Sequence, residues 1–323
     1  MQKTLIAIAA SAAALTVHAA PVNAQEGTRV FERDGSWSLD AGTDSCRLAR
    51  AFSDGEETIA LAFERNRADN FVRLILVGNA IRTFRAADQF GYKFLPANDQ
   101  RSAMYIRSET PDGQSYFNLG TVFIGADPFA MSGGGFGGAP GASGPPPGGD
   151  AGDMPEIIIP PYDRAAEAEF AGNINAIELN EGLLRTIRLE TGSLGGPIEA
   201  LQACTDDLLR SWGLDWEAHQ TMSKRASPVG PAWEWIPNGI VGFEDFAAFG
   251  GARNPFRVMI DAAGKPTECI VHWASLDERT NGTICEAILE NGEFTPALDA
   301  NGQPMASYWM TDYFAALNRP FGQ

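Results

Sequence analysis

The chain has 323 residues, of which 44% are hydrophobic, and its 24 Lys and Arg against 41 Asp and Glu give a formal net charge of −17. A chain this acidic is a poor ligand for the phosphate backbone of nucleic acids, because such binding depends on clustered Lys and Arg. The length is sufficient for two domains, each with a core of its own.

The first residues have the pattern of a bacterial secretory signal peptide. Lys3 provides a positive start, Leu5–Val17 is an apolar run, and small residues precede a cleavage site after Ala24, or alternatively after Ala20. The other interpretation is an uncleaved membrane anchor, but the run is shorter than the roughly 20 residues of a spanning helix. We therefore expect a periplasmic protein with residues 1–24 removed, which contacts the membrane only if the signal stays uncleaved.

Export predicts that the cysteines form disulfides, because an even number of cysteines in an oxidising compartment usually pairs. The cysteines are Cys46, Cys204, Cys269 and Cys285. No C-x-x-C is present, and only His219 and His272 follow the signal segment, so neither a redox dithiol nor a structural zinc site is expected. We expect no metal and no cofactor.

A β-rich region follows the signal. Alternating or continuous apolar runs bounded by polar and Gly residues predict strands. The candidates are Trp37–Leu39, Thr58–Phe63, Asn70–Val77, Ser102–Arg107 and Tyr116–Ile124. Pro111–Gly113 is a turn signal, so the last two candidates are expected to form a hairpin.

The composition then changes to Gly and Pro over residues 131–152. The stretch Met131–Gly149 cannot build a core and predicts a disordered loop. It contains G-x-G-x-x-G at Gly133, Gly135 and Gly138, but several prolines follow, and the motif binds dinucleotides only where it ends a strand and opens a helix. The match is accidental in this interpretation.

Two strands, Asn175–Leu179 and Leu183–Leu189, and a helix over Ser193–Trp212 are predicted after the loop, and Gly213 ends the helix. They complete a β-rich N-terminal domain over residues 25–212, with one closing helix.

Cys204 lies on the apolar stripe of that helix. Cys269 and Cys285, sixteen positions apart, are expected to pair locally, which leaves Cys46 as the partner of Cys204. A Cys46–Cys204 bridge would tie the first strands to the helix. The Gly- and Pro-rich stretch would then be a loop inside the domain rather than a domain boundary.

Residues 213–238 are expected to be the linker between the domains. The stretch carries three prolines and also Trp216, Trp233 and Trp235. These tryptophans could form an aromatic docking strip, but packing against one of the two domains is the simpler interpretation, and we favour it.

The last part of the chain, residues 239–323, reads as a second, α+β domain. Asn254–Asp261 and Thr267–Trp273 predict a β-hairpin, Asp277–Glu290 predicts a helix, and Ser307–Phe314 predicts a final strand. The order is β-β-α-β.

The run F-R-V-x-I-D-x-x-G-K-P-T-E-C-x-V, followed by L-D, T-x-C-x-x-I and F-T-P-A-x-D-x-x-G-Q-P, resembles the TonB C-terminal domain, in its cysteine-containing variety from alphaproteobacterial exported proteins. The resemblance covers about residues 243–314. Matching positions are Asp261, Gly264, Leu276, Asp277, Phe294, Pro296, Ala297, Asp299, Gly302 and Pro304. The resemblance implies a small sheet packed on one helix, with Cys269 of a strand bonded to Cys285 of the helix.

The function that the resemblance implies is partner binding, in which a segment of an outer-membrane transporter or another envelope protein adds a strand to the sheet edge. The expected edge is Tyr308, Trp309, Met310, Thr311, Asp312 and Tyr313. The chain lacks the long Pro-rich spacer of TonB and adds an N-terminal domain, which puts energy transduction in doubt.

An enzyme is not expected, and no catalytic residue is assigned. The chain has no G-x-S-x-G motif, its cysteines are assigned to disulfides, and His272 next to Cys269 reads as a packed or surface residue. Two alternatives stay open: an exported enzyme or envelope-stress factor with a structural TonB-like appendage, and a membrane-anchored energy transducer.

Overall fold

The structure is a computed structural model of the chain. It describes residues 27–69, 71–125, 162–230, 232–236, 240, 255–272, 274 and 276–312. The predicted signal peptide, the predicted loop 131–152 and Tyr313 lie outside the described residues. The fold is a mixed, strand-rich α+β fold.

The first part of the chain forms a ten-stranded sheet in the order β6-β5-β9-β10-β1-β2-β3-β4-β8-β7. Its strands are β1 (Arg29–Ala41), β2 (Cys46–Ser53), β3 (Thr58–Arg65), β4 (Phe71–Val77), β5 (Gln89–Leu95), β6 (Arg101–Met104), β7 (Ile106–Glu109), β8 (Ser115–Phe123), β9 (Ala176–Leu179) and β10 (Ile187–Leu189). Strands β1 and β10 pair in parallel, while the other neighbours are antiparallel.

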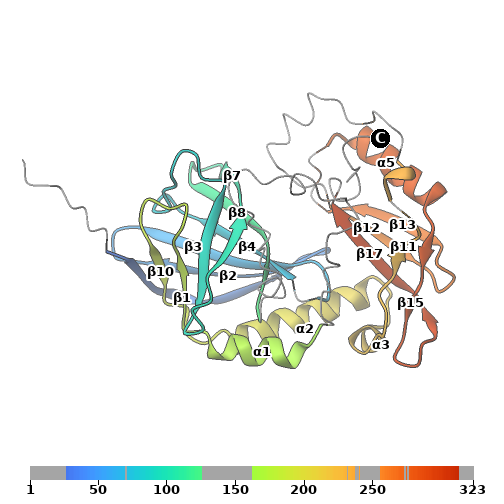
Figure 1. The fold of residues 1–323 in the computed structure, drawn as a ribbon, viewed down its shortest axis with the longest axis horizontal. Helices are drawn as coiled ribbons and strands as arrows, with labels where there is room; N and C mark the ends of the chain where they lie inside the picture. Colours follow the sequence, from blue (N-terminus) through green and yellow to red (C-terminus); the bar gives the residue numbers. More distant parts are fainter. Residues whose placement is uncertain are drawn as a thin grey trace, which may run out of the picture.

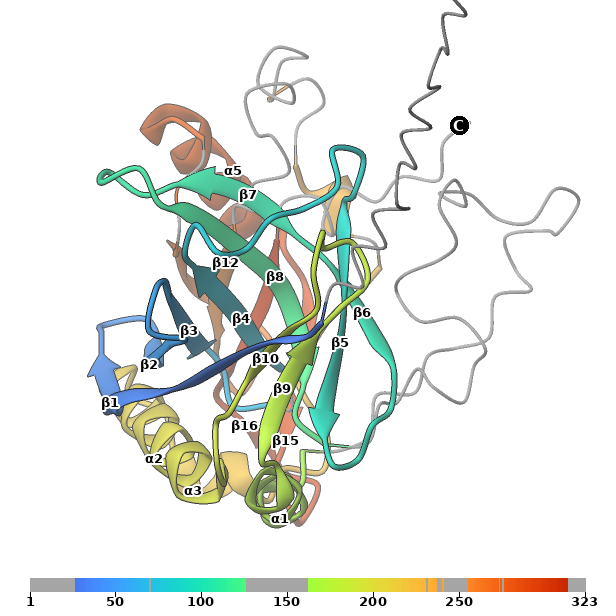
Figure 2. The ribbon, with the colours of Figure 1, turned by 90° about the vertical axis from the view of Figure 1, so that its left-hand side faces the viewer.

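The sheet curls into a barrel-like shape (Figure 2). Its two end strands, β6 and β7, are consecutive pieces of chain separated by Tyr105 alone. Apolar side chains from alternate positions fill the interior, for example Leu48 on β2 and Leu61 and Phe63 on β3. We call this part the barrel unit.

Two helices, α1 (Arg164–Asn173) and α2 (Gly195–Ser211), lie together across one end of the barrel (Figure 1). The predicted apolar stripe of α2 is buried at Ile198, Leu201 and Leu208. Helix α1 was not predicted. It begins at Asp163, whose side chain accepts a hydrogen bond from the backbone N–H of Ala166.

Some predicted strands were wrong in extent or pairing. The stretch Ser102–Arg107 is divided at Tyr105, so that β6 pairs with β5 while β7 forms the hairpin with β8. The strand predicted over Leu183–Leu189 is confined to β10, because Leu183 makes only an isolated bridge to Thr83. Strand β5 was not predicted. Pairing partners decide these limits, and local alternation does not reveal them.

The C-terminal unit, residues 255–312 as described, contains a three-stranded sheet in the order β13-β12-β17. Its elements are β12 (Pro255–Ile260), β13 (Pro266–Val271), α5 (Glu278–Asn291), β14 (Phe294–Thr295), β15 (Ala297–Leu298), β16 (Pro304–Met305) and β17 (Ser307–Asp312). Helix α5 packs on β13 and begins at Asp277, which accepts a hydrogen bond from the Thr280 N–H. This order agrees with the predicted β-β-α-β arrangement.

Gly264 explains the tight turn between β12 and β13. Its φ of +84° favours glycine, and a Cβ atom there would lie 2.1 Å from the carbonyl oxygen of Phe294. The turn therefore packs directly on the chain that follows α5.

The stretch predicted as a linker contains α3 (Trp216–Gln220), β11 (Ser227–Pro228) and the 3₁₀ helix η2 (Ala232–Glu234). Strand β11 pairs with β14, so this part of the stretch is attached to the C-terminal unit. Trp235 packs into the core of that unit beside Phe294 and Trp309, which agrees with packing rather than a docking strip. The side chain of Trp233 lies outside the described residues.

Candidate functional site

Strand β17, the predicted partner-binding edge, lies at one end of the three-stranded sheet. It pairs with β12 along its whole length, from Ser307 opposite Ile260 to Asp312 opposite Pro255. The described residues place no further strand beside it. The side chain of Asp312 is outside the described part, and Thr311 is half-buried.

The two faces of β17 have different surroundings. Trp309 packs into the core of the C-terminal unit, against Trp235 and Phe294. Tyr308 is 8% exposed and lies on the opposite face, toward the barrel unit, with Met310 beside it. The side chains of β17 therefore alternate between two faces, and the barrel unit covers one of them.

A small apolar group, the junction cluster, joins the two units at this face. Its members are Leu209, Leu214, Met259 and Tyr308, with Ala68, Trp212, Trp216 and Met310 packed against them. The ring of Tyr308 meets that of Trp212 edge to face at 5.5 Å between centroids. Its hydroxyl accepts a hydrogen bond of 2.9 Å from the Ala68 N–H.

Arg257 of β12 crosses the same junction. Its side chain is almost fully buried, its guanidinium lies 3.6 Å from the ring centroid of Trp212, and Nη1 is 3.0 Å from a carboxylate oxygen of Asp44. Burial lowers the pKa of Arg257, and the charge of Asp44 opposes that shift. Burial, together with the charge of Arg257, lowers the pKa of the neighbouring His272 to about 4. His272 is therefore neutral near pH 7.

A cavity of about 640 Å³ opens beside the junction cluster, between the barrel unit, the stretch after α3 and strand β17. Its lining comes from four separate parts of the chain. These residues are Arg67, Ala68, Asp69, Phe71, Tyr162, His219, Gln220, Thr221, Met222, Ser223, Lys224, Arg225, Ala226, Tyr308, Trp309 and Met310. Three of the six residues predicted for the partner edge thus line a cavity.

Hydrogen bonds and an ion pair hold the charged wall of this cavity. Nε of Arg67 is 2.5 Å from Oδ2 of Asp69, and the other oxygen of Asp69 accepts from the Phe71 N–H. Nη2 of Arg225 donates to the carbonyl oxygen of Ala68 at 2.9 Å. These contacts fix the positions of the two arginines at the rim.

His219 is buried in the wall and fully engaged. Nδ1 lies 2.6 Å from the carbonyl oxygen of Asp215, and Nε2 lies 3.0 Å from Oγ of Ser307. Burial lowers the pKa of His219. Both ring nitrogens therefore help to hold α3 against β17.

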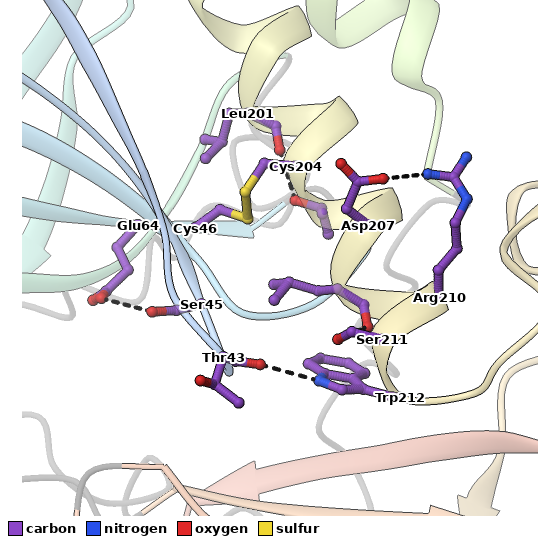
Figure 3. The surroundings of a disulfide bond; sticks show 12 residues. Thr43, Ser45, Cys46, Glu64, Leu201, Cys204, Asp207, Arg210, Ser211 and Trp212 are labelled. Carbon is purple, nitrogen blue, oxygen red and sulfur yellow. Dashed lines mark hydrogen bonds and ion pairs between the residues drawn. A yellow bond between two sulfur atoms is a disulfide. The ribbon is translucent and has the colours of Figure 1, made fainter.

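The cysteines form two disulfides, Cys46–Cys204 and Cys269–Cys285, with Cα–Cα distances of 6.1 and 5.4 Å. These are the predicted pairings. Figure 3 shows the first bridge joining β2 to α2, with Trp212 about two turns further along the chain and its indole N–H directed at the carbonyl oxygen of Thr43. The bridge thus anchors the end of α2 that leads into the junction.

A buried charge network within the barrel unit was not predicted. Arg65 of β3 pairs with Glu167 of α1, and Glu167 also accepts hydrogen bonds from Tyr162 and Gln202. The pKa of Tyr162 is raised by burial. The network thus ties α1 and α2 to β3 of the barrel.

Among the described residues, no group of three or more His, Cys, Asp or Glu side chains is placed to hold a metal ion. None of the helices in the described ranges combines the length and hydrophobicity that crossing a bilayer requires. Comparisons with protein-family models, with curated protein sequences and with solved structures found no match.

Proposed function

We propose that this chain is an exported, non-enzymatic protein-binding module, and that its C-terminal unit holds an extended segment of an envelope protein along strand β17. The observation that carries the proposal is the place of β17. It ends the β13-β12-β17 sheet, and three of its consecutive residues, Tyr308, Trp309 and Met310, line the junction cavity.

An end strand next to a cavity suits strand addition. In this mode main-chain hydrogen bonds provide affinity, and pockets for alternate side chains provide specificity. The resemblance of residues 243–314 to the TonB C-terminal domain supports the same role, since that family binds its partner at this end of the sheet. A segment of an outer-membrane transporter is one such partner.

The two disulfides support export, because disulfides persist in oxidising compartments. A non-enzymatic role is favoured by the burial of Ser307, the hydrogen-bonding partner of His219, and by the engagement of Glu167 with Arg65, Tyr162 and Gln202.

Site-specific photocrosslinking in the native envelope tests the proposal. A photoreactive phenylalanine analogue replaces Met310 on β17 in one variant and Glu268 on β13, the other end of the same sheet, in a matched control. We expect the position 310 variant to crosslink one discrete envelope protein that the position 268 variant does not.

The identified partner is then purified, and its affinity for the unmodified chain is measured. Equal crosslinking from both positions, or a purified partner that does not bind, would refute strand addition at β17.

A further inference from the structure

The junction cavity has the charge of a receptor for anions. Among the described residues that line it, Arg67, Lys224 and Arg225 face a single carboxylate, Asp69, and His219 is neutral near pH 7. The cavity therefore has an excess of two positive charges, in a chain whose net charge is −17. A local reversal of sign of this kind selects among ligands and orients them.

The positive charges of the cavity affect the pKa values of residues in its wall. Burial is the main cause that raises the pKa of the Tyr308 hydroxyl. The positive charge of Arg225 opposes it most strongly, the charge of Asp69 adds to it, and the charge of Arg67 opposes it less. Arg225 also contributes to the lowered pKa of His219, after burial. The cations therefore lie close enough to stabilise a negative group placed in the cavity.

The other wall is aromatic and apolar. Phe71 and Tyr308 contribute rings, and Met222 and Met310 contribute flexible thioethers. The guanidinium of Arg67 lies 4.9 Å from the ring centroid of Phe71, which places a cation at the border between the two walls. A ligand that fits both walls carries a carboxylate next to an aromatic or large apolar group.

The volume and position indicate a peptide. About 640 Å³ is in the range of roughly 300–1,000 Å³ found for ligand clefts, enough for a few side chains. The cavity also runs alongside β17, so a segment added to that strand would direct its side chains into it. The overall negative charge disfavours nucleic acids and anionic membrane surfaces, which present extended phosphate arrays.

We propose that the junction cavity selects an acidic, aromatic segment of the partner protein, with its carboxylates at Arg67, Lys224 and Arg225 and its rings against Phe71 and Tyr308. This inference rests on the proposed function and adds the chemistry of the segment. The chain's own residues 313–323 do not have that chemistry, because they contain no Asp or Glu.

Calorimetric titration of the full chain with two tetrapeptides tests this selection. One is N-acetylated and C-amidated with alternating phenylalanine and aspartate, and the other has asparagine in place of aspartate. We expect the acidic peptide to bind about tenfold more tightly than the neutral one at low ionic strength, as for one charge-assisted contact. The difference should shrink as salt is added.

Lys224→Glu is the test variant, because Lys224 is exposed and the change places a carboxylate at the rim. The change should lower the affinity for the acidic peptide by about tenfold or more. The affinity for the neutral peptide should stay within about twofold of its value for the unmodified chain. Lys265→Glu is the matched control. Lys265 is equally exposed, lies in the β12–β13 turn and does not line the cavity, so both peptides should bind this variant as they bind the unmodified chain.

Equal binding of the two peptides, absence of acidic-peptide binding, or equal effects of the two lysine variants would overturn the inference. The Phe243–Phe246 segment, FEDF, has the ligand's composition. Acidic-peptide binding that appears only in a Glu244→Gln, Asp245→Asn variant would assign the cavity to the chain itself and also overturn the inference. If the position 310 variant crosslinks a partner but the two peptides bind equally well, the proposal of strand addition at β17 is supported. Only the proposed selection of an acidic segment is then refuted.

Discussion

The barrel unit and the C-terminal unit are stabilised by different means. Within the described ranges, the barrel core contains 32 buried residues and the core of the C-terminal unit contains 12. Each unit has one disulfide, but the first bridge spans 158 positions and the second spans 16. A small core gains little from burial alone, so its bridge matters for holding one helix on one sheet.

The comparison shows why a cavity forms where the units meet. The barrel fills its interior with its own side chains, whereas the C-terminal sheet covers one face with α5 and leaves Tyr308 and Met310 to the junction. The junction cluster and the Arg257–Asp44 pair hold the units together without filling the space beside them.

Removing the long bridge should have the largest effect. In the chain-entropy model a closed loop of this length stabilises by about 5 kcal/mol, because it restricts the unfolded chain. The double change Cys46→Ala, Cys204→Ala should therefore lower the free energy of unfolding of the barrel unit by up to that amount, as measured by urea denaturation. A loss below about 1 kcal/mol would mean that packing of α2 alone secures the barrel end.

Breaking the buried charge network should lower the free energy of unfolding by about 3–5 kcal/mol. Arg65→Met leaves Glu167 buried without its cationic partner, which is the costly way to break such a pair. The double change Arg65→Met, Glu167→Leu should recover most of the loss, since it removes both charges. A double variant no more stable than Arg65→Met, in the same denaturation assay, would contradict this interpretation.

Removing the Cys269–Cys285 bridge should lower the free energy of unfolding of the C-terminal unit by about 3 kcal/mol and leave the barrel unit unaffected. The closed loop is about a tenth as long as that of the first bridge, and the model gives about that value for 15 residues. Hydrogen exchange of Cys269→Ala, Cys285→Ala should show faster exchange in β12, β13 and α5, with barrel amides unchanged. Faster exchange in β2 and β3 as well would show that the two units unfold as one.

Acid should destabilise the folded chain at the junction, because His272 there resists protonation. Its pKa in the folded state is about 4, below the value near 6.5 of the unfolded chain. The folded state thus resists protonation, so no effect is expected above pH 7, and stability is lost as the pH falls from about 6.5 to about 4. The loss is on the order of 2 kcal/mol, reduced from the full shift because the side chain is only partly buried.

His272→Gln should flatten that part of the stability–pH profile. His219→Gln is not a suitable control, because His219 is itself hydrogen-bonded across the junction, to Ser307. The control is therefore the unmodified chain, measured by urea denaturation at each pH. An unchanged slope between pH 6.5 and 4 in His272→Gln would assign the acid sensitivity to other groups.

The sequence by itself determined the local elements and the covalent links. Apolar runs bounded by polar and Gly residues predicted β3, β4 and β8, and the pattern of Asp277–Glu290 predicted the helix that is α5. Both cysteine pairings followed from spacing and compartment. Each of these features depends on residues near one another in the chain, or on the small number of possible partners.

Only the tertiary structure decided the barrel closure, helix α1, the buried Arg65–Glu167 pair and the junction cavity. The cavity joins residues of the barrel strands and their connections, Tyr162, the stretch His219–Ala226 and strand β17, which lie far apart in the sequence. Alternation shows which face of a strand is buried but does not show what buries it, because strand order depends on the packing of the whole core. For the same reason β17 could be predicted as a strand, while its Tyr308 face against the barrel could not.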